Sequence, residues 1–383
     1  MPELDSLRGI AVLAVLFFHG FYFSSGVARF HGAERWFLLT TAPGWMGVNL
    51  FFVLSGFLIT GILVDGRRRP DYYRNFYIRR ALRILPAYYA VLLLLLLASR
   101  LRLVLLHVSW AFIGLSGIYL ANVSELFGVP MQYGVLWTLA VEEHFYLLWP
   151  TAVRRASARA LPWICGAIIV GCPGLRSFCY WRHYQYGAGY TWLVADGLAW
   201  GALLALAARG RRSSRPSMLR FGLGCAFASV LIVIALLPFG MASSGTYAGG
   251  VFRVSLINSF FAGVLAITLV IGTGRWRNLL HSRMLRFFGE ISYGLYLIHM
   301  LAFAIVDRRL MHWGVRVSTT SGGFGLIVAR FAAASLFAVG ITYISRWTFE
   351  ERFLRLKDRL VEKPAWDAVR LEQGRELETR AAS

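Results

Sequence analysis

Residues 1–20 read MPELDSLRGIAVLAVLFFHG, an apolar segment of membrane-spanning length with Arg8 near its start and His19 deep inside it. A charge in hydrocarbon is costly unless it is paired or solvated, so ionisable residues in such a segment normally face the protein interior. His19 lies eleven positions after Arg8, which is about 16 Å along a helix. The two side chains therefore lie on much the same face at different depths. They can belong to a membrane-embedded site, or Arg8 can anchor the boundary while His19 is a hydrogen-bonded structural histidine.

The composition of the whole chain predicts many helices of this kind. Of its 383 residues, 57% are hydrophobic and 15% charged, and the mean hydropathy is +0.58. An ordinary soluble domain carries about 25% charged residues. Apolar runs of about 20 residues, the length that spans a bilayer, recur from one end of the chain to the other. The sequence therefore predicts an all-α polytopic membrane protein, which we expect in the cell membrane.

A large positive charge indicates different partners in a membrane protein than in a soluble protein. The net charge of +21 comes almost entirely from arginine. In a soluble protein it would suggest nucleic acid, but here the basic residues cluster between apolar runs, where they report topology and contact with anionic lipid or cofactor. We therefore expect a lipid bilayer and no nucleic acid as partner. The cysteines form no metal-type cluster, and we expect no metal. The first segment lacks the features of a cleavable signal.

Arginine-rich segments set the expected orientation. Residues 65–83 contain seven arginines, which predicts a cytoplasmic loop and a cytoplasmic N-terminus. The basic segments 209–220 and 275–286 are expected on the same side, and 240–250 outside. To agree with these sides, the chain must cross the membrane an odd number of times after residue 83. We therefore expect one crossing between 84 and 121, with the apolar stretch 103–121 partly interfacial or re-entrant. The outcome is about ten transmembrane helices with both termini cytoplasmic, a membrane-embedded domain over residues 1–350 and a charged cytoplasmic tail over 351–383.

Two adjacent carboxylates lie in a second apolar segment, LWTLAVEEHFYLLWP (136–150). Glu142 and Glu143 cannot share a helical face, because successive residues are about 100° apart. We expect one to face the bundle interior and the other to pair elsewhere. Glu142 lies roughly 12 Å deep from the outer side, a depth comparable with that of His19. A carboxylate paired with His19 would fix its tautomer and raise its basicity, as general-base catalysis requires.

A third ionisable group opens another apolar segment, in YIRRALRILP (77–86). Arg80 and Arg83 are three residues apart and share a helical face at the cytoplasmic boundary, with Arg79 beside them. Arginine binds phosphate well because its planar donors bind bidentately. Anchoring at the membrane boundary explains any one of these arginines, but it explains less well a pair aligned toward an intramembrane site.

These motifs, in this order along the chain, resemble the membrane acyltransferase-3 family. The resemblance is carried by Arg8-x10-His19, GVNLFFVLSGFLIT (47–60), Arg80-Ala81-Leu82-Arg83, LWTLAVEEHFYLLWP (136–150) and FGEISYGLYLIHM (288–300). In that family a ten-helix domain takes an acyl group, usually acetyl from cytoplasmic acetyl-CoA. It delivers the group to a hydroxyl of an acceptor, often an extracytoplasmic sugar or a polyketide-type natural product.

The resemblance implies roles for particular residues. His19 corresponds to the essential histidine and Arg8 to a residue of the same site, while Arg80 and Arg83, with Arg79, would engage the CoA phosphates. Glu142 matches the first glutamate of the tryptophan-containing motif. Two departures are visible: His144 stands where the family commonly has glutamine, and FEERF (349–353) replaces the usual Glu-x-Pro-Phe ending. We expect the chain to be the membrane domain alone, without the extra hydrolase domain of some relatives.

The sequence thus predicts an integral membrane O-acyltransferase that acts on a hydroxyl of a cell-surface or exported saccharide, or of a secreted small molecule. His19, oriented by Glu142 or Glu143, would deprotonate the hydroxyl, or His19 would itself carry the acyl group. The alternative is a proton-coupled transporter in which His19 and Glu142 form a relay. A structural or sensory membrane protein would leave the buried ionisable groups unexplained.

Other polar and small residues receive lesser roles. Asp5 is expected to cap the first helix rather than to act in catalysis. His299 is left open between a core histidine and a site residue. Interhelical hydrogen bonds or close packing are expected of four residues in the second apolar segment: Gly47, Asn49, Ser55 and Gly56.

Overall fold

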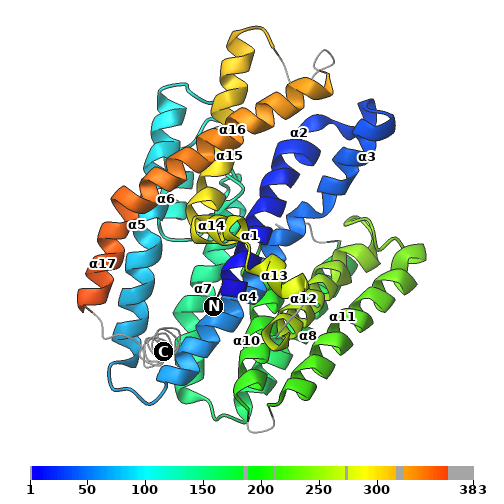
Figure 1. Cartoon of the computed structure of the whole chain (residues 1–383), viewed down its shortest axis with the longest axis vertical. Helices are drawn as coiled ribbons and strands as arrows, with labels where there is room; N and C mark the ends of the chain where they lie inside the picture. The colour runs from blue at the N-terminus through cyan, green and yellow to red at the C-terminus, as the bar shows by residue number, and fades with distance from the viewer. Residues whose placement is uncertain (1, 184–188, 211–212, 272–274, 316–322, 361–383) are drawn as a thin grey trace, which may run out of the picture.

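The computed structural model describes residues 2–183, 189–210, 213–271, 275–315 and 323–360, and within these ranges every regular element is helical. The long helices form a bundle in which α1 (Pro2–Phe17) lies near the middle (Figure 1). In the described ranges seven helices are long and apolar enough to cross a membrane, or eight if the bent pair α14 (Arg283–Glu290) and α15 (Ser292–His312) is one span. The protein is therefore a multi-pass membrane protein, as predicted.

The expected count of about ten spans is not confirmed by these helices. Two further helices of the bundle, α7 (Leu136–Arg155) and α10 (Asp196–Arg209), are too polar or too short to count among these spans. In α7, the run Glu142-Glu143-His144 makes the segment too polar. The 14 residues of α10 are fewer than the about 20 that span a bilayer. The count of ten and the cytoplasmic placement of both termini therefore stay predictions.

The segment between 72 and 127 contains one long helix, which is compatible with the single crossing expected there. One continuous helix, α5 (Tyr72–Arg100), covers the first apolar stretch. The second stretch contains an irregular segment and then only the short α6 (Trp110–Gly117), so it does not form a second long helix. The C-terminal ends of α4 (Gly47–Gly66), α7 and α10 lie at the same lower end of the bundle (Figure 1).

Glycines let four of the helices, α1, α4, α10 and α14, approach one another backbone to backbone. A Cβ on Gly47 of α4 would collide with the carbonyl oxygen of Ala11 in α1, and one on Gly56 would collide with that of Leu198 in α10. The predicted close packing at these two glycines is therefore confirmed. A Cβ on Gly9 would likewise collide with the Leu285 carbonyl, so α1 lies directly against α14.

A buried polar network joins four helices on one side of the site. Arg176 of α8 (Ala160–Trp181) pairs with Asp196 of α10 at 3.2 Å, and both side chains are almost fully buried. Asn258 of α12 (Tyr247–Val270) donates to Asp196 at 3.1 Å, and Asn49 of α4 donates to Asn258 at 2.8 Å. The predicted interhelical hydrogen bond of Asn49 is thus confirmed.

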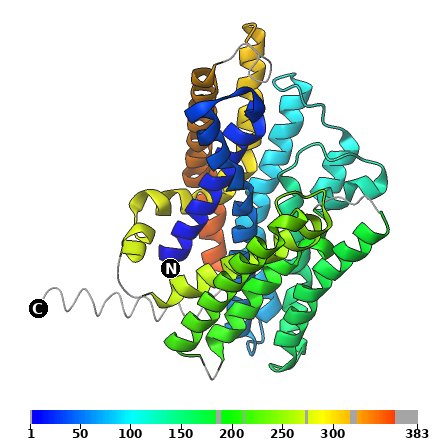
Figure 2. The same cartoon turned by 90° about the vertical axis from the view of Figure 1, so that its right-hand side faces the viewer.

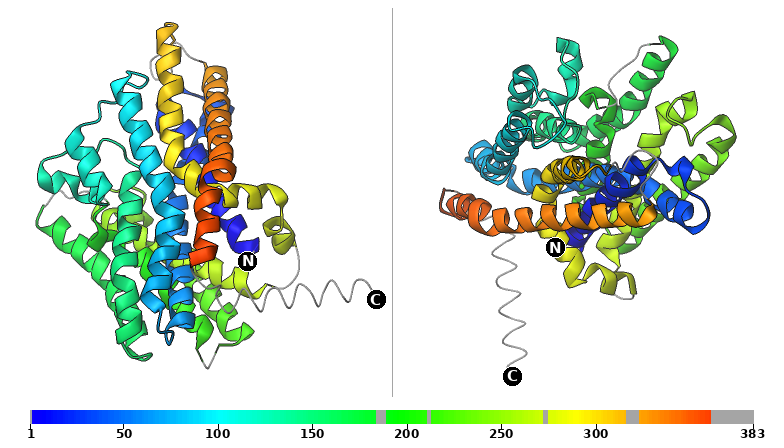
Figure 3. Two further views of the ribbon diagram at one scale, coloured as in Figure 1. Left: turned by 90° about the vertical axis from the view of Figure 1, so that its left-hand side faces the viewer. Right: turned by 90° about the horizontal axis from the view of Figure 1, so that it is seen from above.

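The remaining long helices cover the flanks. The antiparallel pair α11 (Arg215–Leu236) and α12 forms one flank (Figure 2). On another, α16 (Phe324–Ser345) runs beside α15 and continues through a π-helical turn, Arg346–Glu350, into α17 (Glu351–Leu360), which packs beside α5 (Figure 3). The expected tail therefore begins as a helix, and its residues 361–383 lie outside the described ranges.

Candidate active site

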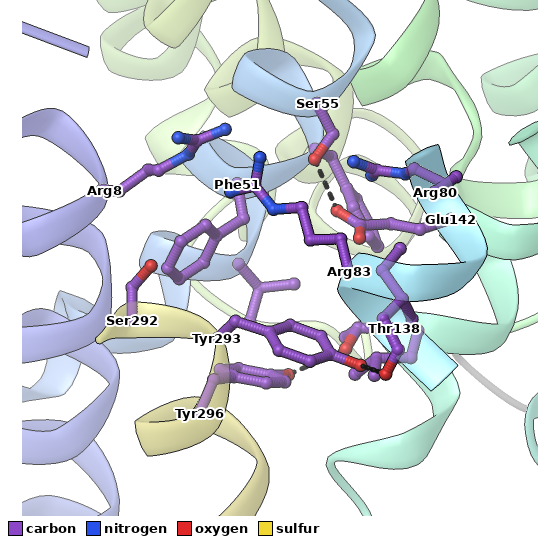
Figure 4. Close-up of a pocket in the computed structure, with 14 residues that line it drawn as sticks. Arg8, Phe51, Ser55, Arg80, Arg83, Thr138, Glu142, Ser292, Tyr293 and Tyr296 are labelled. Carbon is purple, nitrogen blue, oxygen red and sulfur yellow. Dashed lines mark hydrogen bonds between the residues drawn. The ribbon is translucent and has the colours of Figure 1, made fainter. Parts of the chain in front are cut away.

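A cavity of about 90 Å³ opens between five helices near the centre of the bundle (Figure 4). This is several times the ~10–15 Å³ that one water molecule needs, so a small chemical group fits. The residues that line it come from α1, α4, α5, α7 and α15: Arg8, Val48, Phe51, Phe52, Ser55, Arg80, Arg83, Ile84, Thr138, Leu139, Glu142, Ser292, Tyr293 and Tyr296.

Three arginines face this cavity with one carboxylate, Glu142. The sequence placed Arg80 and Arg83 on one face of α5, and the structure confirms that both line the same space with Arg8. Arg79 is not among the described residues that line it. The cavity is therefore strongly cationic.

The arginines of the cavity have few protein partners. Arg8 pairs with Asp5 at 3.3 Å. The Arg80 guanidinium stacks on the Tyr146 ring, 3.8 Å from its centroid, and within the described ranges its buried Nε has no hydrogen-bond partner. Arg83 is exposed, and no described residue forms a hydrogen bond or ion pair with it. Arginine donors are therefore free to bind an anion such as phosphate.

Asp5 does not have the capping role expected from the sequence. It lies inside α1, which already begins at Pro2, and its carboxylate interacts with Arg8 one turn further on. Proline is favoured in the first turn of a helix because its missing N–H has no intrahelical partner there. The helix therefore begins earlier than the Asp5-Ser6 pair suggested.

The two adjacent glutamates of α7 diverge as predicted. Glu142 lines the cavity and accepts a hydrogen bond from Ser55 at 2.7 Å, which confirms Ser55 as an interhelical hydrogen-bonding residue. Glu143 does not line the cavity, although both carboxylates interact electrostatically with Arg80. The next residue, His144, contacts Thr191 Oγ1 at 2.7 Å and so joins α7 to α9 (Thr191–Val194).

His19 lies on a π-helical turn, Phe18–Tyr22, that continues α1 beyond the cavity. Its Nδ1 is 3.0 Å from the Val15 carbonyl oxygen and 3.2 Å from Nε2 of His299. In the described part of the chain, no hydrogen bond or ion pair joins His19 to Glu142 or Glu143. The structure therefore does not join His19 to a carboxylate as expected, and the catalytic roles of His19, Glu142 and Glu143 stay predictions. The partner of His19 is the histidine whose role the sequence left open.

Tyr296 separates the cavity from this histidine pair. Its hydroxyl lies 2.9 Å from Thr138 Oγ1, and its ring centroid is 5.7 Å from that of His299 and 5.9 Å from that of Phe51. Sequence reasoning did not assign it a role. The signal was the spacing of Ser292, Tyr296 and His299 at i, i+4 and i+7, which places polar groups on one face of an apolar helix.

A second feature that the sequence did not reveal is a buried arginine that fixes the turn carrying His19. Arg330 of α16 donates from Nη1 to the Gly20 carbonyl oxygen at 3.1 Å and forms a bidentate pair with Asp307 of α15. Arg330 is only 4% exposed. π-Helical turns are often found at functional sites, and this one is fixed by a buried arginine that no local sequence pattern connects to His19.

The fold and the site together define a multi-pass membrane protein with a cationic cavity next to a histidine pair. The family model described as an acyltransferase domain matches residues 1–346, and the chain belongs to this family, acyltransferase-3. The resemblance inferred from the motifs is therefore confirmed.

Several named proteins are similar to this chain. A Bacillus subtilis protein, YrhL, named as a candidate peptidoglycan O-acetyltransferase, is 30% identical over 78% of the chain and 48% of its own length. The Listeria monocytogenes peptidoglycan O-acetyltransferase OatA is 32% identical over 39% of the chain and 24% of its own length. A candidate O-acetyltransferase of Staphylococcus aureus is 28% identical over 80% of the chain and 51% of its own length. The chain thus spans about half the length of these relatives, or less. No solved structure matches it significantly.

Proposed function

We propose that the chain is an O-acyltransferase that moves an acyl group, with acetyl the first choice, from cytoplasmic acyl-CoA to a hydroxyl of a saccharide outside the membrane. The observation that carries the proposal is the cavity in which Arg8, Arg80 and Arg83 face one carboxylate in a chain of the acyltransferase family. The names of the relatives support a cell-wall saccharide as acceptor.

The donor would bind by its charged end. Its phosphates are dianionic or monoanionic groups that match the open donors of Arg80 and Arg83, and the cavity has room for a small anionic group. Along α1, His19 is about 16 Å from Arg8, so the flexible pantetheine arm of CoA would extend past Tyr296 to bring the thioester to the histidine. Arg79 has no part in this proposal, because it does not line the cavity.

Two routes fit the position of His19. In the first, His19 removes the proton of the acceptor hydroxyl, the oxygen attacks the thioester carbonyl, and the departing CoA sulfur takes the proton from His19. In the second, Nε2 attacks the carbonyl and CoA leaves as the thiolate, which gives a cationic acyl-imidazolium. The acceptor hydroxyl then attacks the acyl group, neutral His19 is released, and the proton of the hydroxyl neutralises the thiolate through solvent. Trapping a radiolabelled acyl group on His19 in a single turnover favours the second route, and its absence favours the first.

Mass spectrometry of cell-wall saccharides tests the function directly. A strain without the chain should lose O-acetyl groups, and wild-type protein should restore them. The His19→Ala variant should restore none, while His107→Ala, which changes an exposed histidine outside the cavity, should act as wild type. Unchanged acetylation without the chain, or full restoration by inserted His19→Ala protein, would contradict the proposal.

A further inference from the structure

The hydrogen-bond geometry of His299 fixes where its proton lies. The residue is 1% exposed, and its Nδ1 is 2.7 Å from the Tyr296 carbonyl oxygen and 3.2 Å from that of Leu295. Carbonyl oxygens only accept hydrogen bonds, so Nδ1 carries the proton. A buried imidazole without a neighbouring carboxylate is neutral, and its Nε2 is therefore an acceptor.

The same reasoning fixes the tautomer of His19. Its Nδ1 faces two acceptors, the Val15 carbonyl oxygen at 3.0 Å and the His299 Nε2 at 3.2 Å. Nδ1 of His19 must therefore be the protonated nitrogen. Its Nε2 then holds a lone pair; this atom is not buried, and no described residue forms a hydrogen bond with it. The pair thus presents one reactive nitrogen, Nε2 of His19.

We propose that His299 is the positioning residue for His19, an inference that rests on the proposed acyl transfer. His299 and the Val15 carbonyl oxygen share the Nδ1–H of His19. His299 thereby orients the ring, and its hydrogen bond strengthens when Nε2 gains a proton or an acyl group and the ring becomes cationic. In other acyl-transfer sites a third group orients the base in this way. Here a neutral imidazole, itself held by two carbonyl oxygens of α15, has that task.

Two substitutions of His299 separate positioning from packing. His299→Gln keeps an oxygen that can accept near the place of Nε2, whereas His299→Leu keeps bulk and removes the acceptor. With the purified full chain, acetyl-CoA and glycan fragments of peptidoglycan, His299→Leu should lower kcat about 10- to 100-fold, as expected for a lost hydrogen bond to a charged group. KM for acetyl-CoA should change less than about twofold. His299→Gln should recover most of kcat, and His312→Leu, at the exposed end of α15, should match wild type.

Wild-type kcat in folded His299→Leu, or equal losses in the Leu and Gln variants, would overturn the positioning role while leaving the proposed function intact. A wild-type chain that transfers no acetyl to these fragments would instead count against the proposed function. In that case solid-state NMR of the histidine-labelled chain in lipid still measures which nitrogens of His19 and His299 are protonated. It should show His19 protonated at Nδ1 in contact with an unprotonated Nε2 of His299, and the reverse protonation would overturn the inference.

Discussion

Arginines lie within the helix bundle of this protein in two settings that differ in how their donors are used. Arg330 directs three nitrogens to the Asp307 carboxylate and the Gly20 carbonyl oxygen, and Arg176 directs its terminal nitrogens to Asp196, Ser255 and the Leu193 carbonyl. By contrast, Arg80 and Arg83 have no hydrogen bond or ion pair with a carboxylate among the described residues. The first setting stabilises the bundle, and the second leaves cationic donors open to a ligand.

The physical reason for the difference is the cost of an uncompensated charge. A buried ion pair is costly to break, because the remaining partner loses both water and its counter-ion. Arg83 avoids this cost because it is exposed to an open space, and the stacking on Tyr146 offsets part of it for Arg80. Removing an arginine should therefore weaken folding in the first setting and ligand binding in the second.

The largest effect on folding is expected for Asp196→Ala, which leaves Arg176 buried without its carboxylate. Both side chains of this pair are at most 3% exposed, and breaking such a pair costs about 3–5 kcal/mol. Denaturant unfolding of the purified protein in detergent measures the change. The matched control is Asp65→Ala, whose pair with Arg209 is solvent-exposed and should contribute at most about 1 kcal/mol. Equal losses in the two variants would contradict the comparison.

A smaller loss is expected for Arg330→Met. Asp307 is 36% exposed and can regain water when its partner is removed, so the free energy of unfolding should fall by about 1–3 kcal/mol. Because Arg330 also holds the Gly20 carbonyl beside His19, kcat for acetyl transfer should fall in the protein that remains folded. Arg309→Met, at an exposed position of α15, is the control. Unchanged stability and kcat would show that Arg330 does not hold the turn.

The smallest effect on folding is expected for Arg83→Ala. This side chain has no hydrogen-bond or ion-pair partner among the described residues and is exposed, so the free energy of unfolding should change by at most about 0.5 kcal/mol. The same unfolding measurement applies. A loss as large as that of Arg330→Met would mean that Arg83 stabilises the fold rather than a ligand.

Helical periodicity predicted much of this site. The spacing of Arg80 and Arg83 placed both on one face of α5, and the 100° rule separated Glu142 from Glu143. These are local properties of one helix, which a sequence displays directly. The long helices were predictable for the same reason, because apolar runs of about 20 residues are visible without tertiary contacts.

The partner of His19 was not predictable in this way. His299 is 280 residues away from His19 in the sequence. Because Glu142 was expected at a membrane depth comparable with that of His19, it was an equally reasonable neighbour. Which helix faces His19 depends on how α15 packs in the bundle, on the π-helical turn at Phe18–Tyr22 and on the buried contact from Arg330. Those are properties of the assembled bundle, as is the position of Tyr296 between the cavity and the histidine pair.

Binding of CoA to the purified full chain in lipid nanodiscs, measured by calorimetry, tests the central claim most directly. Wild-type protein should bind CoA. Arg80→Ala and Arg83→Ala should each raise Kd about 10- to 100-fold, as expected for lost hydrogen bonds between charged groups, while the protein stays folded. Arg79→Ala should change Kd less than about twofold, because Arg79 does not line the cavity. Equal affinity of wild type, Arg80→Ala and Arg83→Ala for CoA would contradict the account.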